Sequence, residues 1–171
     1  GDKGAKVFFC QSGAEANEAA FKLSRRTGKI KVVAAQGAFH GRTMGSISAT
    51  GQPKYQQNLE PLLPGFVHVP FGDIDAVAAA IDHETAAVLI EPIQGEGGIN
   101  IPPAGYMQNL RQLTRDKGML LMLDEVQSGM GRVGEWYAHQ LDAVEADVVS
   151  LAKALASGIA MGGVLARPEV A

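Results

Sequence analysis

Short apolar segments alternate with amphipathic segments along the chain, which is the pattern of an α/β fold. Residues 13–26 carry apolar residues at helical spacing, among them Ala16, Ala20 and Leu23, and a glycine follows. Asp73 precedes another such segment and is a residue type that caps helices. The pattern predicts helices at residues 13–26, 43–50, 74–81 and 106–117, and strands at residues 30–35, 66–69, 86–93, 119–126, 148–152 and 164–166.

These strands are short and apolar on both faces, so both faces need a cover. Because helices separate them along the chain, we predict an α/β domain with a mainly parallel sheet between two helical layers, a three-layer αβα arrangement. Segments 51–65 and 94–105 are rich in Pro, Gly and polar residues and are predicted loops. Such sheets bind ligands beyond the carboxyl ends of their strands, so the polar residues that follow each strand are the functional candidates.

Composition excludes several classes of protein. Hydrophobic residues make up 46% of the chain, charged residues 19%, and the net charge is -3, which excludes a disordered chain and gives no support to nucleic-acid binding. The longest apolar run, around residues 119–123, is too short to cross a bilayer. The single cysteine allows no internal disulfide, so we expect a reducing compartment, the cytoplasm. No metal site is predicted, because metal-ligand spacing is missing among His40, His68, His83 and His139.

Two segments near the start of the chain suit a phosphorylated, flat ligand. Ser12, Gly13 and Ala14 open the first predicted helix, where free backbone N–H groups and the helix dipole favour an anion. A simple helix cap at Ser12 is the alternative. Phe39 and Arg42 follow the next strand, and they could stack on a ring and bind a carboxylate. An ordinary turn, with Phe39 in the core and Arg42 in solvent, remains open.

Acidic residues follow two later strands. Glu91 and Glu96 lie in a glycine-rich segment, for which an ordinary surface loop is the alternative. Asp124 ends the most apolar strand, where a carboxylate is costly to bury without a partner. A nucleotide hydrolase would need a G-x-x-x-x-G-K-[ST] loop, which the sequence lacks, so we expect another cationic partner, such as a protonated ring nitrogen. The G-x-G-x-x-G match at residues 129–134 joins no strand to a long helix and supports a dinucleotide site only weakly.

Lys153 follows the strand predicted at residues 148–152. A lysine that is partly desolvated at such a place can form a Schiff base, whereas a solvated lysine is the ordinary alternative. In their order along the chain, these segments resemble the class III (ornithine-type) aminotransferases of fold type I, which use pyridoxal 5′-phosphate. The resemblance covers essentially the whole chain and is carried by SGAEANEAA (12–20), AFHGRT (38–43), EPIQGEGG (91–98), LDEVQSGMGR (123–132) and AKAL (152–155).

The resemblance implies a role for each cofactor-binding candidate. Lys153 would hold pyridoxal 5′-phosphate as a Schiff base and move the proton between substrate and cofactor. Asp124 would pair with the pyridinium nitrogen, and Gln127 would donate to the ring hydroxyl. Phe39 would stack on the ring, and residues 12–14 would bind the phosphate.

The resemblance also implies substrates. Arg42 would bind a substrate carboxylate, Glu96 would neighbour a second arginine outside this chain, and Glu91 would make a supporting contact. Residues 48–56 and 61–66 are most similar to the acetylornithine-specific branch, which implies transfer of an amino group from N-acetylornithine to 2-oxoglutarate, giving N-acetylglutamate semialdehyde and glutamate, in arginine biosynthesis. Ornithine, succinylornithine and 4-aminobutyrate remain open as amino donors, and an inactive remnant of such an enzyme is a further alternative.

The resemblance implies that residues 1–171 are part of a pyridoxal-phosphate-binding large domain. We expect an excerpt of a longer, homodimeric protein, without the N-terminal segment and the C-terminal small domain that complete the family's site. The chain departs from the family at Ala160, where a proline is usual.

Overall fold

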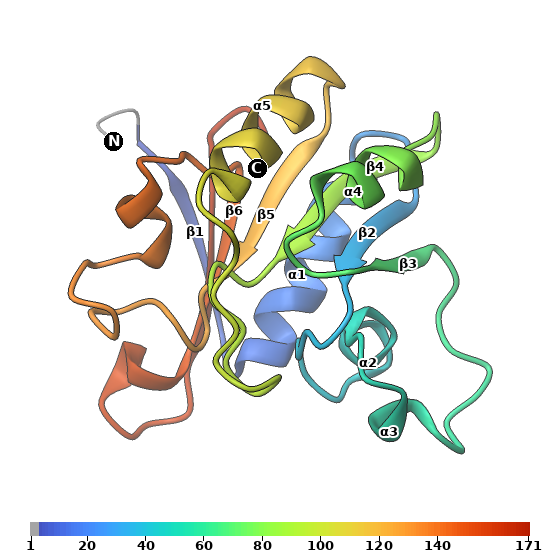
Figure 1. The fold of residues 1–171 in the computed structure, drawn as a ribbon. Helices are drawn as coiled ribbons and strands as arrows, with labels where there is room; N and C mark the ends of the chain where they lie inside the picture. The colour runs from blue at the N-terminus through green and yellow to red at the C-terminus, as the bar shows by residue number, and fades with distance from the viewer. Residues whose placement is uncertain (1–3) are drawn as a thin grey trace.

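Seven strands form one mixed sheet in the computed structural model, which describes residues 4–171 (Figure 1). The first three residues of the expected domain range lie outside this described part. The strand order is β1-β7-β6-β5-β4-β2-β3. Strands β2 to β6 pair in parallel, whereas β7 is antiparallel to both β6 and β1. The strands are β1 (Lys6–Cys10), β2 (Lys31–Ala35), β3 (Phe66–Val69), β4 (Thr85–Ile90), β5 (Leu120–Asp124), β6 (Val148–Leu151) and β7 (Gly162–Ala166).

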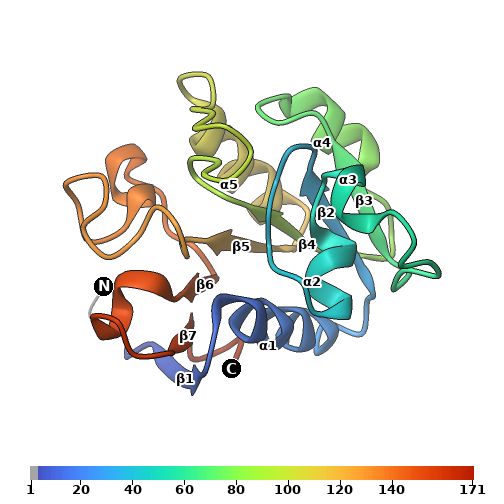
Figure 2. The same ribbon diagram turned by 90° about the horizontal axis from the view of Figure 1, so that it is seen from below.

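Helices cover the sheet on both faces, so the predicted three-layer α/β arrangement is confirmed. Figure 2 shows α1 on one side of the strands and α4 and α5 on the other. None of the helices in the described part is long and apolar enough to span a membrane. The helical elements are α1 (Gly13–Arg25), α2 (Met44–Ala49), α3 (Pro53–Gln56), α4 (Ile74–Ala80), α5 (Tyr106–Asp116) and the 3-10 segments η1 (Ala138–Asp142) and η2 (Lys153–Ala156).

The alternation of side chains along the central strands builds two cores. In β2, Val32 packs in the core beneath α1, while Val33 packs in the core beneath α4 and α5. In β5, Met122 packs in the core beneath α1, and Leu121 packs in the core beneath α4 and α5. Each central strand therefore buries both of its faces, which is why these strands contain no polar face.

Three details differ from the sequence-based expectations. The predicted strands 86–93 and 119–126 end earlier, at Ile90 and Asp124, because the residues that follow leave the sheet and enter the loops of the site. The predicted loop 51–65 contains the one-turn helix α3, which starts with a proline at a position that favours it. Strand β1 was not predicted; it lies at the sheet edge, and its Phe8 and Phe9 are 60% and 64% exposed.

Candidate active site

A cavity of about 340 Å³ lies beyond the carboxyl ends of β4, β5 and β6. It brings together segments that lie far apart in the sequence and come from the loops after five strands. The predicted site residues that line it are Ser12, Gly13, Ala14, Phe39, Glu91, Glu96, Asp124, Gln127 and Lys153. Arg42 is the predicted site residue that does not line the cavity, and it lies at the rim.

The N-terminus of α1 forms one wall. The Ser12 hydroxyl caps the helix by accepting a hydrogen bond from the Glu15 backbone N–H at 3.2 Å, which confirms the cap. The first N–H groups of a helix have no partner within it and face outward. A Cβ atom on Gly13 would approach Val126 Cγ2 to 2.8 Å, so a glycine is needed for the loop after β5 to reach the helix start. The cavity therefore meets open backbone donors at this wall.

Asp124 is 3% exposed, at the floor of the cavity. Its Oδ2 accepts a hydrogen bond from Asn17 Nδ2 at 2.7 Å and lies 2.8 Å from His40 Nδ1, while its Oδ1 accepts from the Val126 N–H at 3.0 Å. An ionised Asp124 requires the proton of this pair to lie on His40 Nδ1. Partners for this buried carboxylate thus exist within the chain, which the sequence pattern did not indicate, so its burial alone does not require an external cation.

Glu91 is also buried and joins two loops of the site. Its Oε1 accepts the Phe39 N–H at 2.8 Å and its Oε2 accepts the Gly95 N–H at 3.0 Å. Burial raises the pKa of Glu91, His40 opposes this rise, and the negative charge of Asp124 adds to it. Glu91 therefore fixes the backbone that carries Phe39.

Lys153 begins η2 directly after β6 and has a positive φ of 48°, an unusual conformation for a residue with a Cβ atom. Its Nζ donates a hydrogen bond to Gln127 Oε1. Of the two alternatives left open by the sequence, the structure shows the solvated lysine, because Lys153 is exposed. Residues 157–160, which follow η2, are also exposed, although Ile159 and Ala160 line the cavity.

Glu96 and Arg42 lie at the cavity mouth, and Tyr55 connects them. The Tyr55 hydroxyl donates to Glu96 Oε1, and Gln52 Nε2 donates to Oε2 at 3.1 Å. These two hydrogen bonds, the first the stronger, hold the pKa of Glu96 below its ordinary value. The Arg42 guanidinium carbon lies 5.5 Å from the centre of the Tyr55 ring and 5.8 Å from that of Phe39. Arg42 is thus exposed, as in the alternative of an ordinary turn, but its guanidinium also lies near two aromatic rings.

Glu125 is a further buried acid that the sequence pattern did not single out. Its Oε1 lies 2.6 Å from His139 Nδ1 and accepts the His139 N–H at 3.0 Å, and its Oε2 accepts the Ala138 N–H at 2.7 Å. This carboxylate anchors the loop between β5 and η1, and so supports the segment that carries Gln127.

The fold and the cavity define an α/β domain in which a helix N-terminus, an aromatic ring, a buried carboxylate and a primary amine face one ligand space. A family model described as aminotransferase class III matches residues 1–171. The chain belongs to the class III aminotransferase family.

Among the residues that the structure describes, no cluster of His, Cys, Asp and Glu side chains has the geometry of a metal site.

Similar proteins cover nearly all of this chain. It is 57% identical over 162 residues to the acetylornithine aminotransferase of Mycolicibacterium smegmatis, covering 95% of the chain and 42% of that protein. It is 53% identical over 167 residues to the acetylornithine aminotransferase of Methanopyrus kandleri, covering 97% of the chain and 43% of that protein. The chain therefore spans less than half the length of these relatives.

Solved structures of aminotransferases share the fold. The ornithine aminotransferase of Toxoplasma gondii ME49 superposes with a TM-score of 0.93 at 34% identity, covering 96% of this chain and 42% of that one. The taurine:2-oxoglutarate aminotransferase of Bifidobacterium kashiwanohense, solved with pyridoxal phosphate and glutamate, superposes with a TM-score of 0.88 at 30% identity, covering 96% and 43%.

Proposed function

We propose that this chain forms the cofactor-binding part of an aminotransferase that uses pyridoxal 5′-phosphate to transfer the amino group of N-acetylornithine to 2-oxoglutarate. The observation that carries the proposal is the gathering of Asp124, Gln127 and Lys153 with the α1 N-terminus around one cavity. The relatives named acetylornithine aminotransferase, 57% and 53% identical to the chain, support the choice of amino donor.

The residues of the cavity fit this cofactor in chemistry and in space. Residues 12–14 provide outward backbone N–H groups for a phosphate, and Gly13 lets Val126, in the loop after β5, pack against this helix start. Asp124 Oδ1 accepts one hydrogen bond, from the Val126 N–H, and so retains a lone pair for a protonated ring nitrogen. Phe39 provides a half-buried ring to stack on a pyridine.

When bound, pyridoxal phosphate supplies an electron sink and a carrier for the amino group. Asp124 would hold the ring nitrogen protonated, and Asn17 and His40 hold Asp124 in place. Gln127 orients the Lys153 amine. Lys153 would hold the cofactor through its amine, and the free amine would move the proton at the reacting carbon.

Substrate binding is proposed for the mouth of the cavity. Arg42 offers a planar guanidinium that suits a carboxylate, and its stacking on two rings orients it. Glu96 also lies at the cavity mouth and would neighbour a second substrate-binding arginine from outside this chain. Ornithine, succinylornithine and 4-aminobutyrate share the required ω-amine and remain alternative donors.

Further proposals concern the whole protein. We infer a cytoplasmic homodimer in which residues 1–171 are part of the large domain, completed by an N-terminal segment and a small domain. The relatives' greater length and the exposed Phe8 and Phe9 on β1 support this inference. The isolated segment is expected to be oligomeric or aggregation-prone and nearly inactive, because such apolar patches drive association.

A side-by-side transamination assay tests the amino donor. The full-length protein is supplied with 2-oxoglutarate and N-acetylornithine, ornithine, succinylornithine or 4-aminobutyrate, and glutamate formation is measured. We expect the highest kcat/KM with N-acetylornithine. A higher value with another donor would transfer the proposal to that substrate, and the absence of glutamate with every donor would favour an inactive remnant.

A further inference from the structure

Tyr55, on the short helix α3, contacts three of the proposed site residues at once. Its ring meets Phe39 edge to face with 5.5 Å between the ring centres, and the Arg42 guanidinium lies over the ring. Its hydroxyl donates to Glu96. The aromatic contact, the cation–π contact and the hydrogen bond therefore all pass through one side chain.

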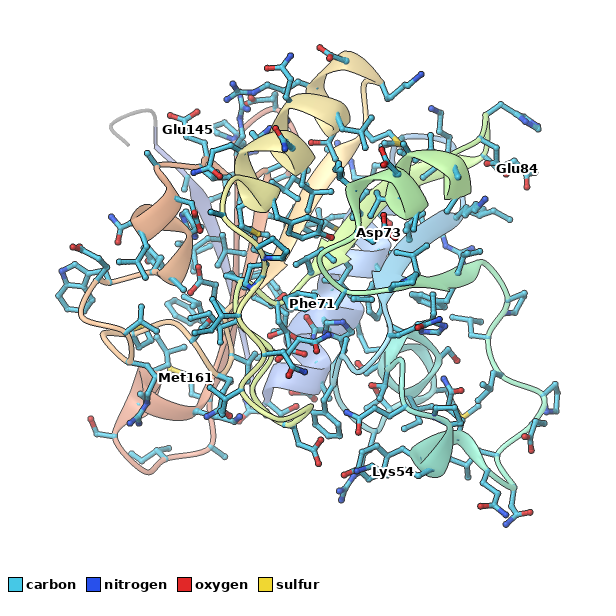
Figure 3. The ribbon with its side chains drawn as sticks, viewed as in Figure 1. Lys54, Phe71, Asp73, Glu84, Glu145 and Met161 are labelled. Carbon is cyan, nitrogen blue, oxygen red and sulfur yellow. The ribbon has the colours of Figure 1, made fainter. Side chains whose placement is uncertain are left out.

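The position of Tyr55 is fixed by its neighbours in the chain. Gln56 Nε2 donates to the backbone carbonyls of Ile47 at 3.0 Å and Thr50 at 2.8 Å, which ties α3 to the end of α2. Gln52 Nε2 donates to the Gly37 carbonyl at 3.1 Å as well as to Glu96. Figure 3 shows Lys54, the neighbour of Tyr55, on α3 at the lower edge of the molecule.

Both oxygens of Glu96 are therefore engaged by neutral donors, Tyr55 and Gln52. Lys54 and, with a smaller effect, Arg42 are close enough for their charges to act on Glu96. Yet within residues 4–171 Arg42 forms no ion pair within 4.0 Å, and its guanidinium lies over the Tyr55 ring instead. An Arg–carboxylate pair is a strong, often bidentate contact, so an unrestrained Glu96 would compete for the same N–H groups that a substrate carboxylate needs.

We propose that Tyr55 is a positioning residue for substrate binding: it stacks the Arg42 guanidinium and restrains Glu96, so that the N–H groups of Arg42 stay free for a substrate carboxylate. This inference rests on the proposed function, because it takes Arg42 as the carboxylate-binding residue. Tyr55 thus sets how tightly the amino donor and 2-oxoglutarate bind, without contacting the reacting atoms.

A double-mutant cycle in the full-length protein tests this role. Tyr55→Phe keeps the ring that stacks on Arg42 and removes the hydroxyl that holds Glu96. We expect KM for N-acetylornithine to rise about ten-fold, more than kcat falls, since a hydrogen bond to a charged group is worth about 1.5 kcal/mol and ten-fold corresponds to about 1.4 kcal/mol. In a Glu96→Gln background the same substitution should change KM less than about two-fold, because a neutral amide does not compete for Arg42.

Two further measurements separate the possible outcomes. Tyr106→Phe deletes a hydroxyl from a buried tyrosine in the core beneath α4 and α5, and it should leave KM unchanged. The Kd of glutarate, a dicarboxylate that cannot react, should follow the same pattern as KM across the four proteins of the cycle. If the wild-type protein does not convert N-acetylornithine, the proposed function fails while the glutarate series still tests Tyr55. Equal losses of glutarate binding from Tyr55→Phe in both backgrounds, or no loss in either, would overturn the inference.

Discussion

Replacing Asp124 by asparagine tests the buried carboxylate beneath the cavity. The change keeps the size of the side chain but removes its negative charge. The asparagine oxygen can still accept from Asn17 and His40 at the Oδ2 position, but its NH₂ group then faces the Val126 N–H, now 3.0 Å from Oδ1. Two donors would oppose each other there, which costs about 1–3 kcal/mol of stability.

The catalytic effect should be larger than this structural cost. Loss of an ionic contact to a protonated ring nitrogen is worth on the order of 3 kcal/mol, and about 2.7 kcal/mol corresponds to a 100-fold loss of rate. We therefore expect kcat of the full-length Asp124→Asn variant to fall by about 100-fold or more, together with a change in the absorbance of the bound cofactor as its ring nitrogen loses its proton.

Asp147 provides the matched control. It is a buried carboxylate 2.6 Å from Arg111 Nη1 that also accepts the Leu121 N–H, and it does not line the cavity. Asp147→Asn should lower Tm but leave the cofactor absorbance unchanged. Near-normal turnover and an unchanged spectrum in Asp124→Asn would mean that Asp124 does not face the cofactor, and would refute the reasoning.

Three other predictions concern single residues of the site. Lys153→Ala in the full-length protein should reduce transamination by several orders of magnitude, as judged from glutamate formation; activity within about ten-fold of wild type would contradict its role. Gly13→Ala should lower the free energy of unfolding by about 1–3 kcal/mol, because its Cβ would lie 2.8 Å from Val126, and an unchanged urea midpoint would show that the loop yields easily. The raised pKa of Glu91 means that the folded protein keeps this proton to higher pH than the unfolded chain, so its contribution to stability is lost as pH rises from the ordinary pKa of 4.5 through the folded pKa. Urea unfolding across this range should therefore show a negative slope that Glu91→Gln reduces, and an equal slope in both proteins would contradict the assignment.

The sequence predicted the layers of the fold well, because burial on both faces leaves a visible mark on the strands. Val32 and Val33 belong to different cores, and only a strand that is covered twice needs both to be apolar. The antiparallel direction of β7 was not predictable, since a short apolar segment carries no sign of its direction. The exposure of Phe8 and Phe9, on the two faces of β1, was not predictable from its apolar composition either.

The candidate site was predicted in its members but not in its contacts. Asp124 was identified because an acid ends an apolar strand, yet its partners Asn17 and His40 lie 107 and 84 residues away in sequence, and no spacing reveals such pairs. Tyr55 was missed because it lies in a segment with few apolar residues, and its significance comes from the aromatic and charged groups that the fold places around it. The exposure of Lys153 was not predictable either, because the residues that precede it are apolar and buried in either alternative.

The most direct test of the account is to locate the covalent attachment of the cofactor. The full-length protein, purified with pyridoxal phosphate, is reduced with borohydride, digested and mapped by mass spectrometry. The account predicts a reduced pyridoxyl group on Lys153, the lysine that lines the cavity together with Asp124 and the start of α1. A pyridoxyl group on any other lysine, or on none, would contradict it.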